Sequence, residues 1–176
     1  MNENIPPGPN PPEKIYVRIE IPSGSKVKYE YDKSFNVIFV DRILHSSVVY
    51  PAAYGFIPQT LCKDGDPLDV LVPLSSGIEL IPGCILIARP IAVLNMKDEK
   101  GKDDKIIAVP TDDPRMEEIQ SISSIPKHLR REIEEFFNTY KQLERGKTTE
   151  IMGWADKEEA QRIIIEAINL YIQKNE

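Results

Sequence analysis

Three aspartates, Asp64, Asp66 and Asp69, occur within the nine residues DGDPLDVLV, on a predicted tight turn that leads directly into an apolar strand. Gly65 allows the backbone to turn sharply and Pro67 restricts its own φ, so the turn should be stiff. Clustered carboxylates repel one another, and either protonation or a hard cation such as Mg²⁺ relieves the repulsion. An ordinary solvated turn has the same composition, so this segment alone leaves both interpretations open.

Further charged side chains occur along the other predicted strands and at their ends, at Glu20, Lys28, Glu30, Arg42, Asp98 and Asp103. Each one alone is most simply a charge on the solvent side of a sheet. If the strands converge, carboxylates accompanied by Lys and Arg would form a multi-metal site. His45 and His128 are not spaced as zinc ligands, so oxygen ligands dominate and favour Mg²⁺ or Mn²⁺.

Three tyrosines have two possible roles. Tyr50 and Tyr54 lie in VVYPAAYGFIP, a predicted loop interrupted by Pro and Gly, and Tyr140 lies on the apolar stripe of a predicted helix. Half-buried packing is the common role of such residues, and donation of a hydroxyl to a phosphate oxygen is the functional alternative. Lys141 is about 100° further round that helix, which predicts a surface lysine.

Alternating and apolar runs predict strands over residues 14–21, 27–32, 36–42, 68–72, 83–97 and 105–110, with a bend near Pro90. A hairpin is the simplest connection between the first two. Helical spacing predicts one helix over residues 126–146 and a last helix with Asp156 as its N-cap. Strands followed by helices indicate an α+β, mainly-β fold, in which an antiparallel barrel is flanked by two C-terminal α-helices.

Composition limits the function. The 176 residues predict a single domain, 1–176. Its residues 1–13 form a Pro-rich N-terminal arm that should lie extended. The net charge of −6 argues against nucleic acid and anionic membranes as partners, and an anionic substrate would then require a local basic cluster or metal ions. No apolar run is long enough to span a membrane, no signal peptide is evident, and Cys62 and Cys84 should be free thiols, which predicts a cytoplasmic protein.

The complete set of motifs resembles the soluble family I inorganic pyrophosphatases, from about Ile15 to the last helix. DGDPLDV (64–70) is similar to that family's signature of three aspartates, and other matches follow in the family's order: IEIP (19–22), KYE (28–30), VDR (40–42), YPAAYGF (50–56), KDEKGKDDK (97–105) and YKQLERGK (140–147). The resemblance implies a five-stranded barrel of the oligonucleotide-binding type. It further implies hydrolysis of inorganic pyrophosphate with several Mg²⁺ ions, for which Mn²⁺ could substitute, and a homohexamer.

The resemblance also implies a role for each matching residue. Asp64, Asp69 and Asp103 would bind the metal pair that activates water, and Asp98 would hold a further metal. Glu30, counted with the metal set, and Glu20 would line the cavity, partly through metal-bound waters. Asp66 would accept the proton of the attacking water. The residues that would hold the phosphates are Lys28, Arg42, Tyr54, Tyr140 and Lys141, with Tyr50 and Lys105 supporting them.

Two positions depart from the family pattern, Ala53 where relatives often have Asn and Thr148 where bacterial relatives often have an aromatic residue. Neither is an expected ligand, so they concern loop packing. Three other functions compete with the pyrophosphatase interpretation. A nucleic-acid-binding barrel would need a basic groove with exposed aromatics, which the acidic composition does not favour. A pseudoenzyme would have no reason to keep mutually repelling carboxylates, and a phosphatase of organic esters would need a pocket that no segment predicts.

Overall fold

The computed structural model describes residues 5–175, so the first four residues of the expected arm and Glu176 lie outside the described part. The β-strands are β1 (Ile15–Ile21), β2 (Val27–Asp32), β3 (Val37–Ile43), β4 (Ala53–Phe56), β5 (Asp69–Val72), β6 (Ile85–Asp98), β7 (Gly101–Lys102), β8 (Lys105–Pro110) and β9 (Thr149–Asp156). The helices are the short 3₁₀ turns η1 (Pro114–Met116) and η2 (Ile122–Ser124), and the α-helices α1 (Lys127–Thr139) and α2 (Lys157–Asn175).

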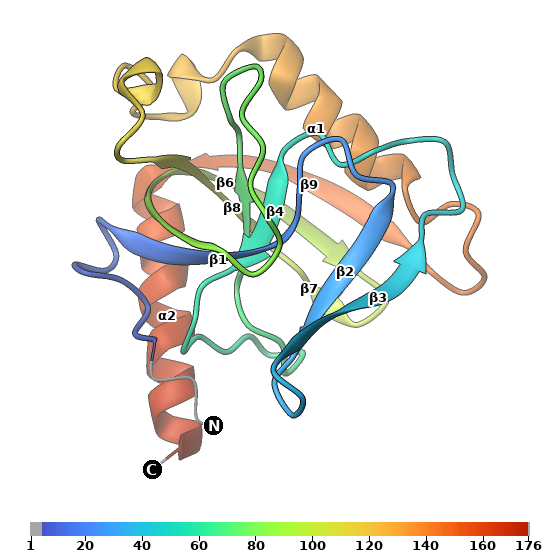
Figure 1. Cartoon of the computed structure of the whole chain (residues 1–176), viewed down its shortest axis with the longest axis horizontal. Helices are drawn as coiled ribbons and strands as arrows, with labels where there is room; N and C mark the ends of the chain where they lie inside the picture. The colour runs from blue at the N-terminus through green and yellow to red at the C-terminus, as the bar shows by residue number, and fades with distance from the viewer. Residues whose placement is uncertain (1–4, 176) are drawn as a thin grey trace.

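Five strands close into a ring. The order is β1-β4-β5-β8-β6, and β6 pairs with β1 to complete the circle, while β7 and β9 extend the sheet along β6. Figure 1 shows this ring with α1 crossing one end and α2 lying along its side. The expected mainly-β barrel with two C-terminal α-helices is confirmed. One pair, β5 with β8, is parallel, whereas the sequence predicted an antiparallel barrel throughout.

The hydrophobic pattern of the strands explains the core. Ile15, Val17, Ile19 and Ile21 of β1 are completely buried, as their alternation predicts. The bend expected near Pro90 is present as a register shift between Pro90 and Ala92 in the pairing of β6 with β8. A proline has no N–H to donate to the ladder, so an irregularity at this position is the expected way to accommodate it.

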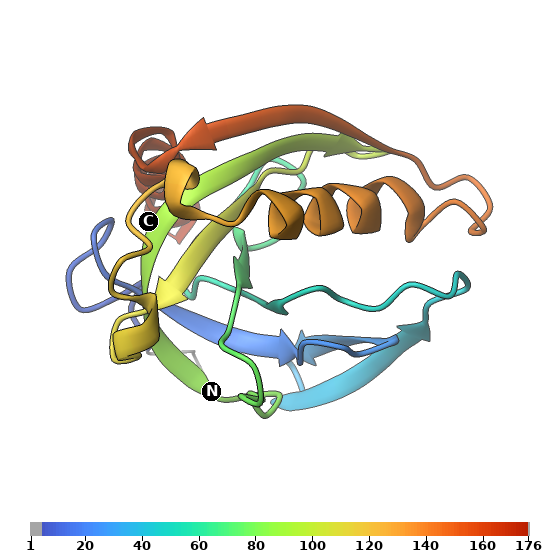
Figure 2. The ribbon, with the colours of Figure 1, turned by 90° about the horizontal axis from the view of Figure 1, so that it is seen from above.

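The expected hairpin between residues 14–21 and 27–32 is wrong. Strand β1 pairs with β4 and β6, and β2 instead pairs with β3 in a separate two-stranded sheet. Figure 2 shows this β2–β3 hairpin on one side of the molecule, with α1 and β9 on the other. Because no residue of β2 is fully buried, its alternation of side chains could not identify which strand it would pair with.

Two helix predictions have different outcomes. The last helix begins directly after Asp156, at the predicted position, and the Asp156 side chain accepts a hydrogen bond from the adjacent Lys157 N–H at 2.9 Å. The helix predicted over 126–146 ends at Thr139, and residues 140–146 form turns. Its apolar stripe ends with it, since Phe136, Phe137 and Tyr140 are buried whereas Leu143 is 66% exposed.

Several local features were not predicted. Strand β4 lies in the segment predicted as a loop, β7 lies in the polar turn before residue 105, and β9 joins the two α-helices. The Pro-rich arm is not helical, as expected, but residues 11–13 form a turn rather than an extended segment. Cys62 and Cys84 are free and half-buried. Within the described residues, no helix is long and apolar enough to cross a membrane.

Candidate active site

The turn that carries the first two aspartates is fixed by its own hydrogen bonds. The Asp66 N–H donates to Asp64 Oδ1 at 3.1 Å, the Cys62 N–H to the Asp66 carbonyl at 2.8 Å, and the Gly65 N–H to the Cys62 carbonyl at 3.1 Å. Gly65 has φ = +94°, which a glycine adopts without strain. The side chain of Asp66 is 62% exposed and accepts a bond from Lys100 Nζ at 3.2 Å. The turn therefore presents Asp66 to solvent on a rigid backbone.

The parallel pairing of β5 with β8 explains how Asp69 meets Lys105. Val70 is opposite Ile106, so the preceding residues, Asp69 and Lys105, begin the two strands at the same edge. Lys105 Nζ lies 2.6 Å from Asp69 Oδ2 and 2.5 Å from Asp103 Oδ1, and the lysine is only 2% exposed. Two carboxylates from different segments thus converge on one buried cation.

Burial and charge shift the pKa values of these groups in different directions. The pKa of Asp103 is raised to about 6. Burial is the main cause and the charge of Asp69 adds to it, while the attraction of Lys105 opposes the increase. For Lys105, burial works to lower the pKa, but Asp69 and Asp103 outweigh it and raise the pKa above its ordinary value. Lys105 is therefore charged throughout the physiological range.

The same aspartates line one cavity. A cavity of about 130 Å³ is lined by Asp64, Asp69 and Asp103 together with Ile163 and Ala167 of α2. The structure thus brings together the three residues expected to bind the metal pair. Asp69 begins β5, Asp64 lies on the turn before it, and Asp103 lies just before β8. Their side chains offer only oxygen atoms, the donors that Mg²⁺ and Mn²⁺ prefer.

Lysines stand beside four of the five carboxylates expected to bind metal. Lys105 pairs with Asp69 and Asp103, Lys141 with Asp98 at 3.0 Å, and Lys28 with Glu30. Within residues 5–175, no group of three or more His, Cys, Asp or Glu side chains is arranged to hold a metal ion. The convergence of Asp69 and Asp103 on one cation and the hard oxygen donors nevertheless fit a divalent metal, which would compete with these lysines.

The β2–β3 hairpin positions two of the expected phosphate ligands. Lys28 is opposite Arg42 in the ladder, and both bond to Asp41 Oδ2, Lys28 Nζ at 3.3 Å and Arg42 Nη1 at 2.5 Å. Arg42 Nε also donates to Glu144 Oε1 at 2.9 Å. Burial works to lower the pKa of Arg42, but Glu144 and Asp41 raise it. The hairpin therefore holds two basic side chains side by side.

The three tyrosines form one aromatic cluster around Phe136. The ring of Tyr50 lies 4.6 Å from that of Phe136 and 5.6 Å from that of Tyr54, and Tyr140 stacks on Phe136 at 4.9 Å between ring centroids. Burial raises the pKa of all three well above the ordinary value. They remain protonated, so each hydroxyl can donate a hydrogen bond. Lys105 Nζ lies 5.7 Å from the Tyr54 ring centre, which places that ring beside the carboxylates.

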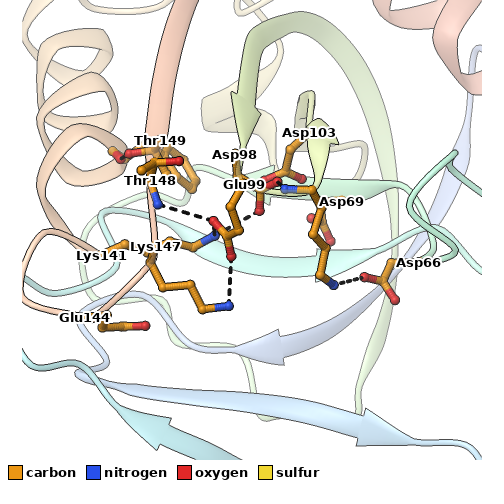
Figure 3. A network of polar contacts seen from close by, with 12 residues as sticks. Asp66, Asp69, Asp98, Glu99, Asp103, Lys141, Glu144, Lys147, Thr148 and Thr149 are labelled. Atoms are coloured by element: carbon orange, nitrogen blue, oxygen red, sulfur yellow. Dashed lines mark hydrogen bonds and ion pairs between the residues drawn. The ribbon is translucent and has the colours of Figure 1, made fainter.

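The interpretation of Lys141 as a surface lysine is wrong. Because α1 ends at Thr139, the chain turns and Lys141 is only 8% exposed, with Nζ 3.0 Å from Asp98 Oδ2 and 3.5 Å from Glu99 Oε2. Burial works to raise the pKa of Asp98, but Lys141 and the Lys100 N–H hold it below its ordinary value. Figure 3 shows Lys141 and Lys147 reaching from one segment toward Asp98 and Glu99 on another.

Glu20 lies at the junction of β1 and the hairpin. Its Oε1 accepts the Tyr31 N–H at 2.7 Å. Burial raises the pKa of Glu20 to about 7; the Tyr31 bond opposes this increase and the charge of Asp69 adds to it. The charge of Asp69 therefore acts on Glu20, and the role of Glu20 in lining the cavity stays a prediction.

Sequence reasoning missed four polar residues of this site. Asp41 lay inside a recognised motif without a role, and Lys100 and Glu99 lay in the turn that contributes Asp98. Glu144 follows Lys141 by three residues, a spacing that would place both on one face of the helix predicted over 126–146, but no role was assigned to it. Glu99 accepts bonds from Lys147 Nζ at 2.8 Å and from the Thr148 N–H at 3.4 Å. Burial works to raise the pKa of Glu99, but these contacts lower it to about 2.

Comparison with known proteins gives one consistent result. The family model described as inorganic pyrophosphatase matches residues 17–172. An inorganic pyrophosphatase of Haloferax volcanii is 48% identical over 96% of this chain and 94% of its own length, and one of Aquifex pyrophilus is 48% identical over 96% of both. The crystal structure of the inorganic pyrophosphatase of Thermus thermophilus is 44% identical, with a TM-score of 0.91 over 94% of this chain and 95% of its own.

Proposed function

The chain belongs to the inorganic pyrophosphatase family and is an inorganic diphosphatase, and we propose that it hydrolyses pyrophosphate with Mg²⁺ ions and Asp66 as the base. The observation that carries the metal part of this proposal is the convergence of Asp69 and Asp103 on one point, occupied by Lys105 Nζ at 2.6 and 2.5 Å. A position between two carboxylates attracts cations. Asp64 lines the same cavity, so three carboxylates could supply oxygen ligands for a metal pair.

In this proposal Asp64, Asp69 and Asp103 hold two metal ions, Asp98 holds a further one, and Glu30 contributes to the same set. When bound, the metal ions supply a water of lowered pKa and offset the charge of pyrophosphate. Mn²⁺ has the same preference for oxygen and would serve as a substitute. Bound metal ions would also explain how a protein with a net charge of −6 can take an anionic substrate, because they would make the electrostatic potential at the site positive.

Asp66 is the proposed general base. Its exposed carboxylate stands on a rigid turn two residues from Asp64, so it can meet a water held beside the metal ligands. A base must lie within hydrogen-bond reach of the proton it accepts, and a charged carboxylate is a competent acceptor. Lys100, on a neighbouring turn, donates to Asp66 Oδ2 at 3.2 Å and so helps to orient the carboxylate.

The proposed phosphate ligands come from three elements. Lys28 and Arg42 lie on the hairpin, Tyr54 lies on β4, and Tyr140 and Lys141 lie directly after α1. Fixed donors of this kind offset the charge that develops on the transferred and leaving phosphates. Tyr50 packs against Tyr54, Glu20 holds the hairpin at Tyr31, and Lys105 orients Asp69 and Asp103, so these three act as the supporting shell.

A comparison of substrates tests this function. Phosphate release would be measured from pyrophosphate and from p-nitrophenyl phosphate, an organic ester, under identical millimolar Mg²⁺. We expect turnover of pyrophosphate and little or no turnover of the ester, because pyrophosphate offers two phosphate groups to the proposed cationic and tyrosine ligands whereas the ester offers one. Faster release from the ester would overturn the proposal in favour of an organic phosphatase.

We also propose that residues 1–176 act as one domain, in a cytoplasmic homohexamer. Free Cys62 and Cys84 are compatible with a reducing compartment. Large exposed side chains, among them Phe35 at 72% and Ile81 at 76%, would be buried by association. Light scattering on the full chain tests the assembly, and a monomeric mass at micromolar concentration would contradict it.

A further inference from the structure

The guanidinium of Arg42 is held between two carboxylates. Nε donates to Glu144 Oε1 at 2.9 Å and Nη1 donates to Asp41 Oδ2 at 2.5 Å. The side chain of Glu144 is only 8% exposed and that of Arg42 is 23% exposed. A guanidinium has five N–H donors in a fixed plane, so two anchored donors fix the direction of the remaining three.

Glu144 belongs to a segment that also contacts the opposite part of the site. Residues 140–148 connect α1 to β9, and Lys141 and Lys147 of this segment pair with Asp98 at the end of β6 and with Glu99 directly after it. Figure 3 shows Glu144 on the same connection as Lys141 and Lys147. The 140–148 connection is therefore attached to the hairpin through Glu144, and to Asp98 and Glu99 through Lys141 and Lys147.

The hairpin needs such an attachment because it is not part of the main sheet. Strands β2 and β3 form their own two-stranded sheet, and a two-stranded hairpin is marginally stable by itself. Glu20 holds β2 at the Tyr31 N–H, whereas Glu144 holds β3 directly at the side chain expected to meet phosphate. A buried ion pair at this place fixes both the hairpin and the guanidinium.

We propose that Glu144 is a positioning residue for the reaction: it anchors Arg42 Nε, so that the free N–H groups of the guanidinium face the phosphates of the substrate. The inference rests on the proposed function, since it assigns Arg42 to substrate. A donor aligned before the reaction stabilises developing charge without reorganisation at the moment of reaction. A lysine at position 42 could not be aligned in this way, because an ammonium has no second edge for Glu144 to hold.

The alternative is that the pair only stabilises the fold. Substitution would then lower the melting temperature and leave the chemistry of folded molecules unchanged. A double-mutant cycle distinguishes a positioning role from a purely stabilising one. It uses Glu144→Gln, Arg42→Lys and both together, with kcat and KM for pyrophosphate as readouts. Glu150→Gln is the control for loss of a surface ion pair, because Glu150 pairs with Lys97 at 2.8 Å, is 63% exposed and has no proposed role in the site.

We expect Glu144→Gln to lower kcat/KM by about 10- to 100-fold, mainly through kcat, because misaligned catalytic groups cost rates of this order. Mg²⁺ affinity should be unchanged, since Glu144 contacts none of the proposed metal ligands. The double variant should be no worse than Arg42→Lys alone, and Glu150→Gln should match wild type. Glu144→Asp keeps the charge with a shorter reach and should fall between wild type and Glu144→Gln.

Two outcomes overturn the inference separately from the proposed function. If wild type hydrolyses pyrophosphate and Glu144→Gln matches it, or if the two substitutions act additively, Glu144 does not position Arg42. A folded wild type that releases no phosphate overturns the proposed function, and this role with it. If Glu144→Gln fails to fold, Glu144→Asp in the same cycle decides the question by the same criteria.

Discussion

At the scale of single residues, the site consists of carboxylates paired with lysines. Asp66, Asp69, Asp98 and Asp103 each bond to a lysine Nζ, although the chain as a whole carries a charge of −6. Each of these pairs places a cation within hydrogen-bond distance of a carboxylate that is proposed to act in the reaction. Metal ions that bind here would compete with these ammonium groups. Substitution of a proposed metal ligand should therefore change metal affinity as well as rate, whereas substitution of the proposed base should change the rate alone.

Replacement of the proposed base tests its role directly. Asp66→Asn should lower kcat by roughly 10²- to 10⁴-fold, the usual contribution of a general base, because an amide cannot accept the proton. The free energy of unfolding should change by no more than about 0.5 kcal/mol, since the side chain is largely exposed. Asp112→Asn, at another exposed aspartate, is the control. Wild-type turnover by Asp66→Asn would remove Asp66 from this role.

Replacement of a proposed metal ligand should have a different signature. Asp69→Ala should weaken Mg²⁺ binding, measured by calorimetric titration of the protein without substrate, as well as lowering the rate. The reason is that Asp69 Oδ2 points to the position where the two carboxylates converge. An Mg²⁺ titration identical to that of wild type would exclude Asp69 from the metal set, whatever happened to turnover.

The raised pKa of Glu20 predicts a pH dependence of stability. Burial raises this pKa from 4.5 to about 7, so the folded protein binds the proton more tightly than the unfolded chain does. The resulting stabilisation is fully present below the ordinary pKa and is lost as the pH rises through about 7.

This dependence can be measured in EDTA by urea unfolding of wild type and Glu20→Gln. Between about pH 5 and about pH 8, wild type should lose about 1–3 kcal/mol relative to the variant, whose side chain does not titrate. Parallel pH profiles for the two proteins would show that Glu20 has an ordinary pKa.

At the scale of elements, the strand pairs determine which residues meet. Asp69 meets Lys105 because β5 and β8 are parallel and in register at Val70 and Ile106. Lys28 meets Arg42 because β2 and β3 are antiparallel. Lys141 meets Asp98 because α1 ends at Thr139 and the chain turns into the site. In each contact the partner residue lies at least 14 residues away in sequence, at Lys105, Arg42 or Asp98.

The close approach of β1 to β4 gives a test at this scale. A Cβ at position 55 would lie 1.9 Å from the Arg18 carbonyl oxygen, so Gly55→Ala cannot be accommodated while the strands pair. The free energy of unfolding should fall by at least about 3 kcal/mol in urea unfolding. Gly77→Ala, where nothing lies within 4 Å, should cost only about 1 kcal/mol through its positive φ. Equal losses in the two variants would contradict the observed strand spacing.

The sequence predicted what local patterns encode. The alternation of β1, the bend of β6 near Pro90 and the start of α2 after Asp156 all depend on residues close together, and the structure confirms them. The partner of β2, the end of α1 and strands β4 and β9 depend on tertiary packing, and these were wrong or missed. The aspartate turn was visible as a short motif, whereas Asp41, Glu99, Glu144 and Lys100 acquire a role only through contacts with distant segments.

At the scale of the whole molecule, the barrel brings the proposed metal ligands and the proposed phosphate ligands together from different elements. The aspartates proposed to bind metal lie on β5, on the turn before it, at the end of β6 and just before β8, while the proposed phosphate ligands lie on the hairpin, β4 and the 140–148 connection. The net charge of −6 does not favour nucleic acid, whose binding requires a basic groove. The arrangement of proposed ligands suits a small, highly charged anion that arrives with metal ions.

Metal-dependent hydrolysis of pyrophosphate is the central claim, and one assay tests it most directly. Phosphate release from pyrophosphate would be followed with millimolar Mg²⁺, then with excess EDTA, and then after Mg²⁺ is restored, on protein shown to be folded by circular dichroism. We predict rapid release with Mg²⁺, loss of release in EDTA and recovery on restoring the metal. Absence of release from the folded protein, or release that EDTA does not affect, would contradict the account.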